Sequence, residues 1–91
     1  MSVSVQIPYA LRHECAGKSE VEVNAGSVQD ALTDLKNHQP KLYRSVCDET
    51  GAVRKHINLY INETIIHRVD GLQKKLEPGD LLFIMTAVSG G

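Results

Sequence analysis

Apolar and polar residues alternate along three short stretches of the chain. Residues 3–7 and 20–24 carry valine or isoleucine at every second position, with polar residues between them. A period of two places those apolar side chains on one buried face, so both stretches are predicted as strands. Pro8 ends the first strand, and the polar residues 9–18 connect it to the second. We expect the two strands to form an antiparallel hairpin with an unusually long loop.

The apolar spacing then changes to the period of an amphipathic helix. Residues at positions i, i+3, i+4 and i+7 form its apolar stripe: Val28, Ala31, Leu32 and Leu35. Ser27 is the expected N-cap, and Asp30 three positions later makes a variant of the capping box. The helix is expected to end before Pro40. Residues 42–46 then fit a short helical turn, and residues 48–51 a solvated loop.

Residues 57–61 alternate again and are predicted as a third strand. A turn and a short return strand beginning at Ile65 are expected next. The sequence Glu77-Pro78-Gly79-Asp80 is a strong turn signal, and residues 81–88 after it are predicted as the last strand. This order of elements predicts an α+β roll, in which one main helix covers one face of the sheet.

The last strand is apolar at nearly every position and therefore has no obvious polar face. If Leu82 and Ile84 face the helix, three outward side chains lie beside Tyr60: Leu81, Phe83 and Met85. The opposite phase exposes Leu82 and Ile84 instead, so either phase leaves an apolar patch away from the helix. A strand buried on both faces is the alternative, but it requires a second covering element. A contiguous exposed apolar patch favours binding to a partner.

The composition is that of one small globular domain. The 91 residues are 42% hydrophobic and 23% charged, with a formal net charge of -1, which leaves room for one core. The absence of a basic block, of tryptophan and of all but one phenylalanine argues against nucleic-acid binding. The longest apolar run, residues 81–85, is too short to cross a membrane. The first residues lack a signal-peptide pattern, so a cytoplasmic protein is expected.

Cysteine and histidine are the candidate metal ligands and nucleophiles. Cys15 and Cys47 are far apart in the sequence, which in a reducing compartment predicts two unpaired thiols. Cys15 lies in a polar segment where it could be exposed. No two of the four histidines have the close spacing of a ligand pair, so no metal site is expected. No phosphate loop, nucleophile elbow or paired acid and base is present, which argues against an independent enzyme.

The sequence ends at Val88-Ser89-Gly90-Gly91. Two residues without Cβ make a thin arm that can pass through a narrow channel and present its carboxylate to an enzyme. Glycine is also common in disordered termini, so the tail by itself leaves both interpretations open.

Three segments together resemble the ubiquitin-like sulfur carriers of the MoaD/ThiS family. They are residues 57–62, the acidic turn at residues 76–80 and, above all, residues 85–91 ending in Gly-Gly. The order of elements matches over nearly the whole chain. The beginning of the chain and its length look closer to the CysO-type carriers of cysteine biosynthesis.

The resemblance implies a fold and a function. The fold is a ubiquitin-like β-grasp domain over residues 1–88, with a mixed sheet and a flexible tail over residues 89–91. The function is that of a carrier that binds no cofactor of its own. In the family, an adenylyltransferase related to ubiquitin-activating enzymes uses ATP to adenylate the terminal glycine, here Gly91. A sulfur donor then converts the adenylate to a thiocarboxylate.

The resemblance also assigns roles to individual residues. Gly90 keeps the approach to Gly91 thin, and Ser89 lies along the arm, where many relatives have alanine or threonine. Docking on the activating enzyme, and then on the enzyme that accepts the sulfur, is assigned to Tyr60, Phe83 and Met85. These three residues belong to the expected outward patch.

Several functions fit the same tail. The sulfur can serve cysteine or molybdopterin biosynthesis, and in the second pathway the carrier is also the small subunit of the synthase. A ubiquitin-like modifier uses the same adenylate but joins Gly91 to a lysine of another protein. The sequence leaves the pathway and the alternative of conjugation open.

Overall fold

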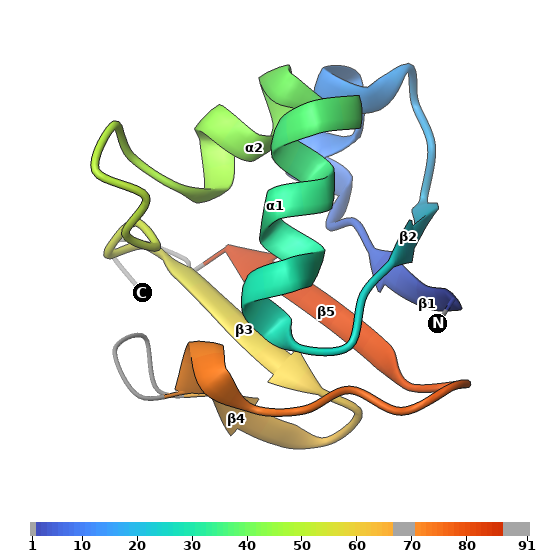
Figure 1. Ribbon diagram of the computed structural model, residues 1–91. Helices are drawn as coiled ribbons and strands as arrows, with labels where there is room; N and C mark the ends of the chain where they lie inside the picture. Colours follow the sequence, from blue (N-terminus) through green and yellow to red (C-terminus); the bar gives the residue numbers. More distant parts are fainter. Residues whose placement is uncertain (1, 67–70, 87–91) are drawn as a thin grey trace.

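The computed structural model describes residues 2–66 and 71–86, which form a five-stranded sheet with helices on one side (Figure 1). The strands are β1 (Ser2–Gln6), β2 (Glu20–Asn24), β3 (Ile57–Ile61), β4 (Thr64–Ile66) and β5 (Leu81–Thr86). The α-helices are α1 (Val28–His38) and α2 (Pro40–Val46), and the 3-10 helices are η1 (Tyr9–Cys15) and η2 (Gly71–Gln73). The predicted order of strands and main helix is confirmed.

The sheet is mixed, with the strand order β2-β1-β5-β3-β4. β1 and β2 form the expected antiparallel hairpin, and β3 is antiparallel to both β4 and β5. β1 and β5 are parallel, although they come from opposite ends of the chain. Because parallel neighbouring strands run in the same direction, Gln6 and Thr86 end their strands at the same end of the sheet.

The core lies between α1 and the sheet. The predicted stripe of α1 is buried, and so are the inward residues of the strands, which include Val3, Val5, Leu59, Leu82 and Ile84. Ser27 caps α1 as expected, because its Oγ accepts a hydrogen bond from the Asp30 amide at 3.1 Å. Pro40 begins α2 immediately after α1 ends.

The turn before β5 also has the expected form. The Asp80 amide donates to the Glu77 carbonyl, and the Asp80 carboxylate accepts from the Glu77 amide at 2.9 Å. Gly79 has a φ of +90°, a conformation that strongly favours glycine. The turn therefore gives β5 a fixed starting point.

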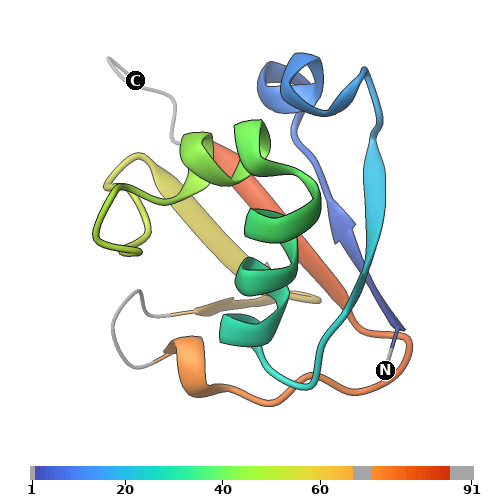
Figure 2. The ribbon, with the colours of Figure 1, turned by 45° about the horizontal axis from the view of Figure 1, so that its top comes forward.

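The helical content exceeds the single main helix that the sequence predicts. The short turn expected near residues 42–46 is a complete α-helix, and the connection over residues 9–18 contains η1. α2 packs against α1 and η1, on the same side of the sheet as α1 (Figures 1 and 2). The extra helices therefore enlarge one layer, and within the described residues no helix covers the opposite face.

None of the described helices combines the length and the apolar character needed to span a membrane.

Candidate functional site

The uncovered face of the sheet carries the residues expected to dock a partner. Leu82 and Ile84 are buried against the helical layer, so the first of the two possible phases of β5 is correct. Phe83 lies on the opposite face, in register with Tyr60 of β3, and both are partly buried. Met85 is opposite Asn58 and is 46% exposed. The structure thus brings Tyr60, Phe83 and Met85 together on one surface.

Two further apolar residues extend this surface. Ile65 of β4 pairs with Tyr60 on the side away from β5, and it is half exposed. Leu81 begins β5 and is also exposed. The outer patch is defined here as Tyr60, Ile65, Leu81, Phe83 and Met85. The sequence pattern predicts Leu81 as outward but gives no sign of Ile65, because Ile65 neighbours the equally apolar Ile66 and therefore shows no alternation.

The outer patch ends where the sheet passes from β5 to β1. On β1 and β2 the outward residues are polar and bond to one another, as Ser4 Oγ and Gln6 Nε2 both donate to the Glu20 carboxylate. These hydrogen bonds, that of Ser4 first, lower the pKa of Glu20 because they favour its ionised form. The outer face is therefore half polar and half apolar, and the apolar half adjoins the strand that leads to the C-terminus.

The predicted tail lies outside the described residues. The structure describes residues 2–66 and 71–86, and these ranges do not include His67, Val88, Ser89, Gly90 or Gly91. β5 is described to Thr86, two residues short of its predicted end. The assignments to Ser89, Gly90 and Gly91 remain predictions.

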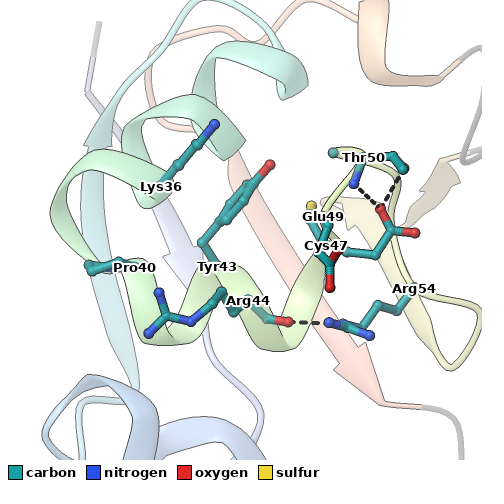
Figure 3. Close-up of a pocket in the computed structure, with 10 residues that line it drawn as sticks. Lys36, Pro40, Tyr43, Arg44, Cys47, Glu49, Thr50 and Arg54 are labelled. Atoms are coloured by element: carbon teal, nitrogen blue, oxygen red, sulfur yellow. Dashed lines mark hydrogen bonds between the residues drawn. The ribbon is translucent and has the colours of Figure 1, made fainter.

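A separate hollow lies between α1, α2 and the loop that follows α2 (Figure 3). Lys36, Tyr43 and Arg44 approach it from the helices, and Cys47 and Arg54 from the loop side. Nε of Arg54 donates to the Arg44 carbonyl at 2.9 Å and so joins the loop to α2. Sequence patterns did not indicate this hollow, because its residues are brought together by the packing of α2.

Two acidic groups of this hollow, the Tyr43 hydroxyl and the Cys47 thiol, have surroundings that favour their protonated forms. Burial raises the pKa of the Tyr43 hydroxyl, and the neighbouring Cys47 and Asp48 raise it further. Burial also raises the pKa of the Cys47 thiol, against the opposing effect of a hydrogen bond with Tyr43. A thiol reacts as thiolate, so these surroundings disfavour a nucleophilic role for Cys47 at neutral pH.

Both cysteines are free, as predicted, but the suggestion that Cys15 is exposed is wrong. Cys15 is buried in the core, and its Sγ donates to the Lys18 carbonyl. The 3-10 winding of η1 directs this one residue inward while its polar neighbours face outward. Among residues 2–66 and 71–86, no group of three or more His, Cys, Asp or Glu side chains is arranged to hold a metal ion.

Comparisons of the sequence and of the structure with known proteins find the same kind of relative. A model of the ThiS family matches residues 9–91. The sulfur carrier protein CysO of Mycobacterium tuberculosis is 27% identical over 93 aligned positions, which span all of both chains. The structure of the BexX/CysO complex of Amycolatopsis orientalis contains a chain with 29% identity and a TM-score of 0.85, covering 98% of this chain and 99% of that one.

The solution structure of small archaeal modifier protein 1 from Methanosarcina acetivorans is also similar. It has 30% identity and a TM-score of 0.80, with 99% of this chain and 96% of that chain covered. These likenesses confirm the ubiquitin-like β-grasp fold that the sequence resemblance implied.

Proposed function

The chain belongs to the ThiS family, and we propose that it works as a sulfur carrier rather than as an enzyme. The observation that carries the proposal is the extent of the family match, which runs through the outer patch and the glycine pair to Gly91. The full-length similarity to proteins named sulfur carrier protein CysO supports the same function.

In the proposed cycle, a partner enzyme activates the Gly91 carboxylate. A carboxylate is a poor electrophile, because its negative charge is delocalised and repels nucleophiles. One carboxylate oxygen attacks the α-phosphorus of ATP, pyrophosphate leaves, and a glycyl adenylate forms. Hydrosulfide released by a sulfur donor then attacks the carbonyl carbon, AMP departs with the bonding electrons, and loss of the sulfur's proton leaves a C-terminal thiocarboxylate. ATP is the partner's substrate, and the carrier itself holds no cofactor.

The geometry of the domain supports docking as part of this cycle. Five residues follow Thr86 in the sequence, and a fully extended chain of that length spans at most about 17 Å. An enzyme that receives Gly91 must therefore contact the folded domain close to the end of β5. Met85 and Phe83 of the outer patch lie near that end, and a surface of apolar and aromatic side chains suits a protein interface. We assign initial docking to Tyr60, Phe83 and Met85.

The thiocarboxylate is proposed to supply sulfur to a biosynthetic enzyme of cysteine or molybdopterin formation. The similarity to CysO favours the cysteine route. We place the carrier in the cytoplasm, where the partner finds ATP and where the free thiols of Cys15 and Cys47 stay reduced.

Deletion of Gly91 tests the proposal directly. Without the terminal glycine, the carboxylate ends one residue short of the enzyme's nucleotide, so carrier-dependent exchange between ATP and pyrophosphate should vanish. The measurement uses the adenylyltransferase homologue from the same genome. The melting temperature should stay nearly unchanged, since residues 2–86 contain the buried core.

A second variant adds one bulky residue after Gly91. It should abolish exchange in the same way. A large fall in melting temperature on deletion of Gly91 would mean that the tail is structural. Full exchange activity of the deleted chain would refute the role of Gly91.

A ubiquitin-like modifier is the second candidate function, favoured by the likeness to small archaeal modifier protein 1. Mass spectrometry of the protein produced in its own organism separates the two functions. Replacement of one terminal oxygen by sulfur supports the carrier, whereas a branched peptide joining Gly91 to a lysine of another protein supports the modifier.

A further inference from the structure

The 3-10 helix η1 lies beside the proposed docking surface. The sequence pattern did not predict this position. β1 is parallel to β5, with Gln6 in register with Phe83. The chain that leaves β1 therefore enters η1 close to Met85 of β5. Tyr9 and Arg12 of η1 line one shallow hollow together with Phe83 and Met85.

Tyr9 is the most exposed of the large apolar residues in the described ranges, with 84% of its surface accessible. A tyrosine is a large, rigid side chain with a polar end, which is why tyrosine is enriched at protein interfaces. Beside the outer patch, Tyr9 continues the apolar surface of β5 beyond the edge of the sheet.

Arg12 is held in a fixed position. Its Nε donates to the Ile7 carbonyl at 3.1 Å, and its guanidinium carbon lies 5.7 Å from the centre of the Tyr9 ring. The Gly17 amide, in turn, donates to the Arg12 carbonyl at 2.7 Å and closes the loop around it. These contacts reduce the conformational entropy that Arg12 would lose when it binds a partner.

The charge of Arg12 is unmatched within the part of the chain that the structure describes. The nearby Glu14 pairs with His13 at 2.7 Å, and none of the described carboxylates forms an ion pair with Arg12. Its Nη groups therefore remain available, and their planar geometry suits a carboxylate bound through two hydrogen bonds.

We propose that Tyr9 and Arg12 form the second half of the docking surface and that Arg12 binds a carboxylate of the enzyme that activates the tail. This inference rests on the proposed function. The occupant is that enzyme, because the short tail forces it to approach the end of the sheet that η1 flanks. In this arrangement the outer patch contributes apolar contact, and Arg12 contributes charge recognition and orientation.

Charge reversal at Arg12, compared with the same reversal at Lys18, tests the inference. Lys18 is exposed in the same loop but does not line the hollow. Lys18→Glu changes the net charge by the same amount as Arg12→Glu and therefore controls for charge alone. In carrier-dependent exchange between ATP and pyrophosphate with the adenylyltransferase homologue of the same genome, Arg12→Glu should raise the KM for the carrier about tenfold or more. Lys18→Glu should change it by less than about twofold. The kcat should change little, since Arg12 is not placed at the reacting carboxylate.

Three further variants keep the test valid if Arg12→Glu fails to fold. Arg12→Lys retains the charge and should keep a lower KM than Arg12→Glu or Arg12→Gln. Tyr9→Ala removes an exposed ring without opening the core and should raise KM several-fold. Equal KM values for the Arg12→Glu and Lys18→Glu variants, with Tyr9→Ala at the wild-type value, would overturn the inference while leaving the proposed function intact. Absence of exchange with the wild-type carrier would instead refute the proposed function and the inference together.

Discussion

The carboxylate of Asp48 organises the loop between α2 and β3. Its Oδ1 accepts hydrogen bonds from the Thr50 hydroxyl at 2.6 Å, the Thr50 amide at 2.9 Å and the Ala52 amide at 3.1 Å. The bond from the Thr50 hydroxyl contributes most to lowering the pKa of Asp48 below its ordinary value of 3.8. The sequence predicted a solvated loop here, and all three donors that converge on this oxygen come from within four residues of Asp48.

Replacement of Asp48 by alanine should lower the melting temperature at neutral pH. A carboxyl group with a lowered pKa in the folded state stabilises the fold above its unfolded pKa, and this stabilisation is lost as the pH falls through the folded pKa. The difference between wild type and variant should therefore narrow below about pH 4. Thermal melts across a pH series provide the measurement.

The neighbouring Glu49 provides the control for this experiment. It is exposed and is not among the residues that bond the loop, so Glu49→Ala should leave the melting temperature nearly unchanged at every pH. A gap between wild type and Asp48→Ala that stays constant down to acidic pH would show that the ionised carboxylate does not stabilise the loop.

At the scale of elements, the pairing of β1 with β5 determines where the proposed docking surface lies. The parallel pair places η1 at the end of β5, and the antiparallel pair with β3 places Tyr60 beside Phe83. β1 and β3 are recognisable from local periodicity, but β1 and β5, which are neighbours in the sheet, are separated by most of the chain. The order of the strands in the sheet therefore brings the residues of the candidate site together.

The packing of η2 against β4 depends on a glycine. A Cβ added to Gly71 would lie 1.9 Å from Cγ2 of Ile66 and 3.2 Å from its backbone carbonyl carbon. Because Cγ2 sits on a branched Cβ next to the backbone, it has little freedom to move away. Gly71→Ala should destabilise the fold by about 1–3 kcal/mol, measured by chemical denaturation.

Gly26→Ala is the matched control, since a Cβ at Gly26 meets only Asp30 Oδ2 at 3.8 Å. Its effect should stay within about 0.5 kcal/mol. A Gly71→Ala variant as stable as wild type would contradict the close contact between η2 and β4.

At the scale of the whole molecule, the residues that stabilise the fold and the residues proposed to bind partners lie on opposite faces of the sheet. The helices cover one face of the sheet (Figure 1) and enclose the core. The outer patch lies on the opposite face. Adjacent residues of β5 thus have different roles, Leu82 and Ile84 in the core and Phe83 and Met85 outside it. In the proposed cycle, the outer patch can contact successive enzymes without disturbing the packing that holds the domain together.

Phe83→Glu should test this separation. A carboxylate in the outer patch should weaken binding to the adenylyltransferase at least about tenfold, which corresponds to about 1.4 kcal/mol. The folded state should survive, because Phe83 faces away from the core. Titration calorimetry and circular dichroism measure the two effects.

Phe83→Leu retains an apolar side chain and should keep most of the affinity. Ile84→Ala, one position further, removes a buried side chain and should cost about 2–5 kcal/mol of stability. Unfolding of the Phe83→Glu variant would show that another element covers the outer face.

The sequence by itself determined the strands and the main helix α1, because their signals are local. The alternation of residues 3–7, the stripe of α1 and the Ser27 cap each depend on side chains within a few residues of one another. Local patterns also predicted an outward apolar patch, but not which phase of β5 was correct. Only the tertiary structure decided that Phe83 faces outward, that Cys15 is buried and that Tyr9 and Arg12 lie beside Met85. The physical reason is that these relations depend on contacts between segments distant in sequence, which form only when α1 covers one face and β1 pairs with β5.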